Sequence, residues 1–209
     1  GSFRVWDSAP PEVLERIEKL FNEQLTPREV VSRILDSVRW RGDPAVFGYT
    51  KMLDGIELES LEVPKAALKQ ACDDTPADLR KAMETVEARV RSFHEACMPK
   101  SWIDDATGLG ERFTPMARAG VYAPGGLAAY PSTVLMTAVP AKVAGVEEII
   151  LATPSGRESG PNPIVLAAAY IAGVDRVFRM GGAQAIAAMA YGTDTVPKVD
   201  IVCGPGNIF

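Results

Sequence analysis

The fold of this chain is decided by the stretch Glu148-Ile149-Ile150-Leu151-Ala152-Thr153-Pro154-Ser155-Gly156. Its apolar residues occupy both faces of a short strand, which is typical of a parallel sheet that helices cover on both sides. The strand ends in a turn that contains proline and glycine. This stretch therefore predicts an α/β fold.

Three similar runs of β-branched and apolar residues occur in the second half of the chain, separated by helical patterns. Strands are predicted near Gly120–Ala123, Glu148–Ala152, Arg176–Arg179 and Asp200–Cys203. Helices are predicted near Ser132–Ala144, Pro161–Ala172 and Ala183–Tyr191. Alternation of this kind predicts a Rossmann-like parallel sheet with right-handed crossovers.

The first half of the chain has a different period, because apolar residues recur there at helical spacing. Thr26-Pro27-Arg28-Glu29 has the pattern of a helix start with a capping box, and Thr75-Pro76-Ala77-Asp78 repeats it. We predict a helical region over residues 1–103, a connecting segment over 104–118 and a Rossmann-like α/β region over 119–209.

Composition excludes several classes of partner. The 209 residues include 22 Lys and Arg against 27 Asp and Glu, without a dense basic stripe, so we expect no nucleic-acid partner. No apolar run is long enough to span a bilayer, so no membrane partner is expected either. No secretion signal follows Gly1-Ser2, and Cys72, Cys97 and Cys203 are widely spaced, which favours reduced thiols and a cytoplasmic location.

A ligand site is predicted where the strands end. The four turns over residues 122–126, 152–156, 180–184 and 203–207 should lie along one edge of the sheet. This carboxyl edge is where open α/β sheets bind ligands, and helix N-termini there offer N–H groups to an anion such as a pyrophosphate. Any one such turn is more often structural, so the prediction depends on all four. The usual dinucleotide fingerprint is absent, which leaves the ligand's identity open.

Three side chains at these turns are candidate ligand-binding residues. Tyr122 could stack on a planar ligand or fill the rim, and Gln184 should leave an amide at the ligand edge. Asn207 could bind the ligand or cap a following helix. His94 is the single histidine, and with three scattered cysteines it makes no zinc site. We therefore predict no catalytic and no metal-binding residue.

Several ordered blocks of the sequence resemble the histidinol dehydrogenase family. The main blocks are Gly120–Gly126, Tyr130–Met136, Gly181–Ala188, Tyr191–Thr193, Val196–Asp200 and Gly204–Asn207. The segments Ile34-Leu35, Arg41-Gly42-Asp43 and Phe93-His94 are also similar to the N-terminal portion of that family. The resemblance covers nearly the whole chain but only about half of the family's length.

The resemblance implies an aldehyde-dehydrogenase-like fold and a homodimeric, zinc-dependent enzyme. Such an enzyme oxidises L-histidinol through L-histidinal to L-histidine and passes hydrides to two NAD molecules in turn. The family's NAD contacts fall on Tyr122, Gln184 and Asn207. Its zinc ligands and acid-base pair follow Phe209, so we expect this chain to carry the cofactor platform but, alone, neither to bind zinc tightly nor to oxidise histidinol.

Two alternatives stay open from the sequence. One is a related enzyme that acts on another small alcohol, which the missing substrate residues would distinguish. The other is a non-catalytic nucleotide-binding module for which 209 residues is the natural length.

Overall fold

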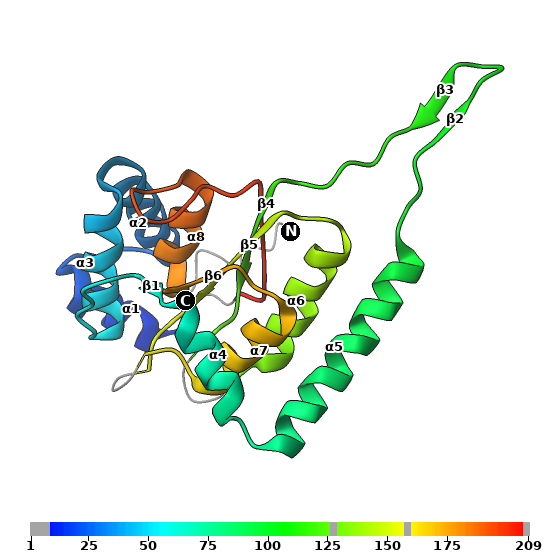
Figure 1. Cartoon of the computed structure of the whole chain (residues 1–209). Coiled ribbons are helices and arrows are strands. Elements are labelled where there is room, and N and C mark those ends of the chain that lie inside the picture. The colour runs from blue at the N-terminus through cyan, green and yellow to red at the C-terminus, as the bar shows by residue number, and fades with distance from the viewer. Residues whose placement is uncertain (1–8, 126–128, 157–159, 207–209) are drawn as a thin grey trace.

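The computed structural model describes residues 9–125, 129–156 and 160–206. A five-stranded sheet with the strand order β1-β6-β5-β4-β7 forms its centre (Figure 1). The strands are β1 (Glu62–Val63), β2 (Trp102–Asp104), β3 (Leu109–Glu111), β4 (Arg118–Tyr122), β5 (Glu148–Thr153), β6 (Arg176–Arg179) and β7 (Ile201–Cys203). The helices are α1 (Pro11–Phe21), α2 (Pro27–Arg41), α3 (Asp43–Asp54), α4 (Lys65–Asp74), α5 (Ala77–Cys97), α6 (Pro131–Val143), α7 (Pro163–Ala172) and α8 (Gly182–Tyr191).

The predicted α/β fold is confirmed, because all four predicted strands are present and run parallel. β4 pairs with β5 on one side and with β7 on the other, and β5 pairs with β6. The three helices predicted between them are α6, α7 and α8.

Both faces of the sheet are covered, as the apolar run in β5 predicts. Ile149 and Leu151 belong to a core formed with α6 and α7, whereas Ile150 and Ala152 belong to a second core formed with α2 and α8. Neighbouring strand residues point to opposite faces, so each core takes alternate residues of β5. This arrangement fixes α2 and α8 on the same face of the sheet.

The structure corrects two sequence-based expectations in the first half of the chain. β1 lies within the region predicted to be helical, and it pairs antiparallel with β6 at the edge of the sheet. Thr75 does not cap α5, because its buried hydroxyl donates to the Ala71 carbonyl at 2.7 Å and so completes the last turn of α4. The capping box of Thr26 and Glu29 is confirmed. The domain boundaries at residues 103 and 118 stay a prediction.

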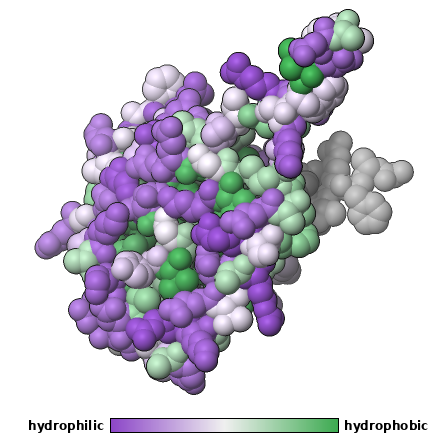
Figure 2. All heavy atoms as spheres, turned by 45° about the vertical axis from the view of Figure 1, so that its right-hand side comes forward, coloured by the Kyte–Doolittle hydropathy of each residue, from purple (hydrophilic) through white to green (hydrophobic). Residues whose placement is uncertain are grey.

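A hairpin of β2 and β3 projects from the body beyond the end of α5 (Figure 1). Trp102, Ile103 and Leu109 on it are 52%, 71% and 67% exposed. Figure 2 shows hydrophobic spheres among hydrophilic ones on this projecting arm. A two-stranded hairpin has little stability by itself in water, so an arm of this kind is suited to a contact with another surface.

Among the described residues, none of the helices combines the length and the hydropathy that a membrane crossing requires. The three cysteines are free thiols. Cys72 is buried, whereas Cys97 and Cys203 are exposed.

Replacing Glu62 by Gln is expected to lower the free energy of unfolding by about 0.5–1 kcal/mol at neutral pH. Both carboxylate oxygens of Glu62 accept hydrogen bonds from Arg176, at 2.7 and 2.6 Å, and tie β1 to β6. These bonds hold the pKa of Glu62 below its ordinary value of 4.5. The expected loss of stability is small because the Glu62 side chain is 39% exposed and water screens the ion pair.

The sign of the pH dependence follows from the lowered pKa. The stabilisation by Glu62 is fully present above the unfolded pKa of 4.5 and is lost as pH falls through the lower folded pKa. Urea unfolding of the two proteins at neutral pH and well below pH 4.5 measures this loss. Glu57→Gln is the matched control, because Glu57 pairs with Lys51 on the exposed surface. A difference in the free energy of unfolding between wild type and Glu62→Gln that persists in acid would contradict a stabilising role of the Glu62 carboxylate.

Candidate functional site

The four strand-end turns meet at one edge of the sheet, as the sequence predicts. Gly125, after β4, and Gly181, after β6, both lie against Pro154, which follows β5. A side chain on either glycine would collide with Pro154. A side chain on Gly204, after β7, would collide with the carbonyl of Tyr122 at the end of β4. These contacts need glycine, because only a residue without a side chain allows the backbones to approach so closely.

A cleft of about 870 Å³ opens at this edge. One wall is α2 from Pro27 to Leu35, and the other is formed by the ends of β4 and β7 and by the start of α8. The lining residues are Pro27, Arg28, Val31, Ser32, Leu35, Tyr122, Pro124, Gly182, Ala183, Ile186, Val202, Gly204, Pro205 and Gly206. Its volume lies in the range of small-molecule and cofactor sites, and its walls are mostly apolar, as such sites usually are.

Tyr122 lies in the cleft, where the sequence predicts a ligand-binding residue. Its hydroxyl oxygen accepts a hydrogen bond from the backbone N–H of Gly182 at 3.3 Å. Burial raises the pKa of the Tyr122 phenol, and the nearby carboxylate of Asp54 raises it further. The phenol therefore stays protonated at neutral pH, and its O–H remains a hydrogen-bond donor.

Gln184 lies beneath the cleft instead of lining it, so its amide is not open at the ligand edge as the sequence suggests. Its side chain is 1% exposed, and neither its amide nitrogen nor its amide oxygen has a hydrogen-bond partner among the described residues. A Cβ on Gly182 would stand 2.8 Å from the Gln184 amide oxygen. The amide therefore lies directly against the part of α8 that lines the cleft. A buried amide without partners costs free energy, and such a group is a natural place for a ligand contact.

Asn207, the third predicted residue, lies outside the described residues. Gly204, Pro205 and Gly206, which precede it, do line the cleft. The opposite wall is not predicted from the sequence, because the start of α2 has only the pattern of a capped helix. No local sequence signal indicates that this helix faces the strand ends.

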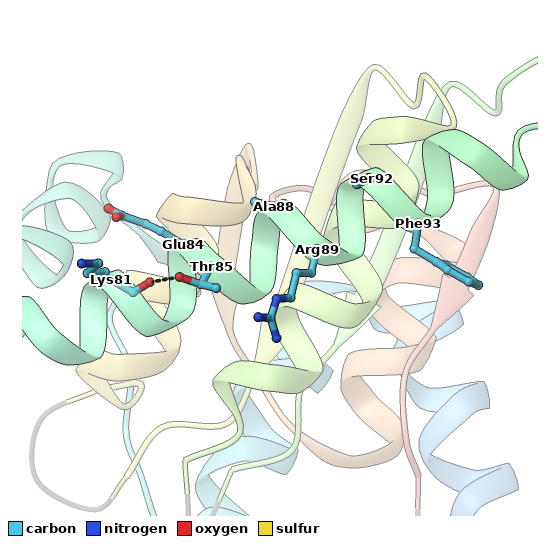
Figure 3. A pocket seen from close by; sticks show the side chains of 7 residues that line it. All are labelled: Lys81, Glu84, Thr85, Ala88, Arg89, Ser92 and Phe93. Carbon is cyan, nitrogen blue, oxygen red and sulfur yellow. Dashed lines mark hydrogen bonds between the residues drawn. The ribbon is translucent and has the colours of Figure 1, made fainter.

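A second depression, of about 680 Å³, follows the outer face of α5 (Figure 3). Lys81, Glu84 and Arg89 extend from this one helix into open space, and the Thr85 hydroxyl is used within the helix by a bond to the Lys81 carbonyl at 2.7 Å. No other element supplies residues to it. The candidate site is therefore the cleft at the strand ends.

Over residues 9–125, 129–156 and 160–206, no three or more His, Cys, Asp and Glu side chains are grouped so that they could hold a metal ion. His94 lies on α5, where its ring packs edge-on against Phe93 with 5.3 Å between the ring centroids. His94 therefore lies on the helix that precedes the projecting hairpin and not at the cleft.

Comparison with known proteins gives one consistent family. The family model described as histidinol dehydrogenase matches residues 18–209. The histidinol dehydrogenase of Synechococcus sp. is 48% identical over 203 residues, which are 94% of this chain and 47% of that protein. The histidinol dehydrogenase of Pseudomonas fluorescens (strain Pf0-1) is 46% identical over 218 residues, with 100% of this chain and 49% of that protein covered.

A solved structure agrees with the sequence relatives. The crystal structure of histidinol dehydrogenase from Elizabethkingia anophelis matches with a TM-score of 0.82 at 30% identity, and the match covers 95% of this chain and 47% of that one. The chain spans about half the length of the relatives that it matches. Because the family model, the relatives and the fold agree, this chain belongs to the histidinol dehydrogenase family, a family of oxidoreductases.

Proposed function

We propose that this chain carries the NAD-binding part of an enzyme that oxidises L-histidinol through L-histidinal to L-histidine. The observation that supports this proposal most strongly is the cleft at the strand ends, with the unpartnered Gln184 amide beneath it. Family membership supports the reaction, since relatives about twice as long are named histidinol dehydrogenases. NAD, when bound, supplies the hydride acceptor.

The residues of the cleft suit a dinucleotide. The apolar wall residues Val31, Leu35 and Ile186 can take a planar ring between them. The phenol of Tyr122 can donate a hydrogen bond to a ligand oxygen while it accepts from Gly182. The amide of Gln184 is buried beside Gly182 and does not line the cleft, but it can both donate and accept, and we propose that it turns toward the carboxamide or a hydroxyl group of the ligand on binding. We propose that Asn207 completes this set.

Zinc does not fit the described part of this chain. The described residues contain no suitable group of three His, Cys, Asp and Glu side chains. We therefore propose that the described part of the chain contributes neither a metal ligand nor an acid-base residue.

The sharpest test replaces Gln184 by Met, a side chain of similar size without polar atoms. We expect the free energy of unfolding without ligand to rise by about 1 kcal/mol, because an unpartnered buried amide is removed. We expect the dissociation constant for NAD to rise roughly fivefold, since a ligand hydrogen bond is lost. Thermal unfolding measures the first change, and an NAD titration followed by chemical shifts or calorimetry measures the second.

Gln70→Met is the matched control. Gln70 is also a helical glutamine, but it is exposed on α4 and donates to Asp74 at 2.8 Å, so its loss should leave NAD binding unchanged. An unaltered NAD affinity in the Gln184 variant would show that Gln184 does not contact NAD. Chemical-shift changes confined to α5 would place the nucleotide elsewhere and contradict the proposed function.

We also propose that the protein works as a homodimer in the cytoplasm. The projecting hairpin supports the dimer, because Trp102, Ile103 and Leu109 leave apolar surface exposed on it. The three free thiols support a reducing compartment.

A further inference from the structure

The cleft is polarised by two helices that come from distant parts of the sequence. α2 begins at Pro27 and α8 begins at Gly182, and both residues line the cleft. Helix N-termini carry partial positive charge. The N–H of Gly182 donates to the Tyr122 hydroxyl, but the N-cap residue of α8, Gly181, has no side chain to satisfy the N–H groups that follow. The start of α8 therefore keeps its ability to bind an anion.

Arg28 adds a full positive charge to this arrangement. It is the one charged side chain among the described residues that line the cleft. Arg28 is in the first turn of α2, where a cation is unfavourable for the helix itself. The neighbouring Glu29 does not line the cleft, and its carboxylate accepts bonds from the backbone and the hydroxyl of Thr26, each at 2.8 Å.

An independent observation indicates that a ligand belongs in this place. Gln184 is almost fully buried and unpartnered among the described residues, and its amide lies against Gly182, which lines the cleft. A polar side chain of this kind is expected to have a partner, and the described residues supply none. The ligand should thus combine an anionic group, a planar ring and hydrogen-bonding groups.

We propose that Arg28 binds a phosphate group of the nucleotide, so that α2 and the N-terminus of α8 hold the phosphates from opposite walls. The helical first part of the chain then supplies half of the cofactor site and not only its support. Guanidinium groups suit this task, because their planar N–H groups match phosphate oxygens in pairs. This proposal rests on the proposed function that the cleft takes NAD.

The test compares wild type, Arg28→Gln and Arg28→Lys by calorimetry with NAD, ADP and adenosine as the probes, at low and high salt. For Arg28→Gln we expect the dissociation constants of NAD and ADP to rise roughly five- to tenfold, since a charge-assisted bond is lost. Adenosine, which has no phosphate, should bind unchanged. The salt dependence of NAD binding should become weaker, and lysine should restore part of the affinity.

Arg89→Gln is the control, because Arg89 is an arginine on the outer face of α5, away from the cleft. Equal losses of ADP and adenosine affinity in Arg28→Gln, or no loss at all, would overturn the role of Arg28. The proposed function would survive that result as long as wild type binds NAD and the Gln184 variant binds it less well. A wild-type protein that binds none of the three probes would overturn both proposals.

Discussion

Replacing Trp102 and Ile103 together by serine is expected to raise the dissociation constant of the proposed homodimer at least roughly tenfold. Burying a large apolar side chain contributes about 1.5–3 kcal/mol, and about 1.4 kcal/mol corresponds to a factor of ten. Both side chains are more than half exposed on the hairpin and have little to lose within the monomer. Sedimentation velocity at several protein concentrations measures the change.

The control is Trp40→Ser, which removes an even more exposed tryptophan, 80% accessible, from α2. This variant should associate like wild type, because Trp40 lies outside the hairpin. A dimer that is insensitive to both changes would show that the arm takes no part in association. A wild-type protein that stays monomeric at high concentration would contradict the proposed homodimer itself.

Replacing Gly182 by Ala should weaken NAD binding about tenfold and lower the free energy of unfolding by about 1–2 kcal/mol. Gly182 has a φ of +57°, a conformation that residues with a side chain adopt only at a cost. Its added methyl group would also stand 2.8 Å from the Gln184 amide oxygen and displace that amide from its present position. The methyl group thus disturbs the backbone of Gly182 and the amide of Gln184. It also disturbs the hydrogen bond from the Gly182 N–H to the Tyr122 hydroxyl.

Gly206→Ala is the control for this change. Gly206 also lines the cleft, but a Cβ there would meet no atom within 4 Å. Its replacement should therefore change stability and NAD affinity very little. Thermal unfolding and calorimetry with NAD compare the two variants, and equal effects would mean that crowding of the cleft, and not the Gln184 amide, determines affinity.

The sheet and part of the site could be predicted because their signals are local. The apolar run of β5 is buried on both faces, and this single property indicates parallel strands between helices. Tyr122 could be assigned to the ligand edge because it ends a strand. The contact of Gly204 with Tyr122 follows from the same reasoning, since turns after parallel strands meet at one edge.

Other features could not be predicted, because contacts distant in sequence determine them. β1 has two residues, and it is a strand only because β6 offers an edge to pair with. Arg28 has the local pattern of a surface residue on a capped helix, and only the packing of α2 against α8 brings it to the cleft. The helical spacing of apolar residues in the first half of the chain predicts buried helix faces, yet Phe93 on α5 is exposed.

The pairing of β1 with β6 has a consequence for the protein while it is being synthesised. Glu62 and Arg176 are 114 residues apart, so β1 leaves the ribosome well before its partner strand exists. At ordinary rates of translation this interval is on the order of ten seconds. During that time the apolar faces of α2 and α3 have neither the sheet nor α8 to pack against. The segment up to β1 is therefore prone to aggregate until β6 emerges. Chaperones would be most useful during this interval.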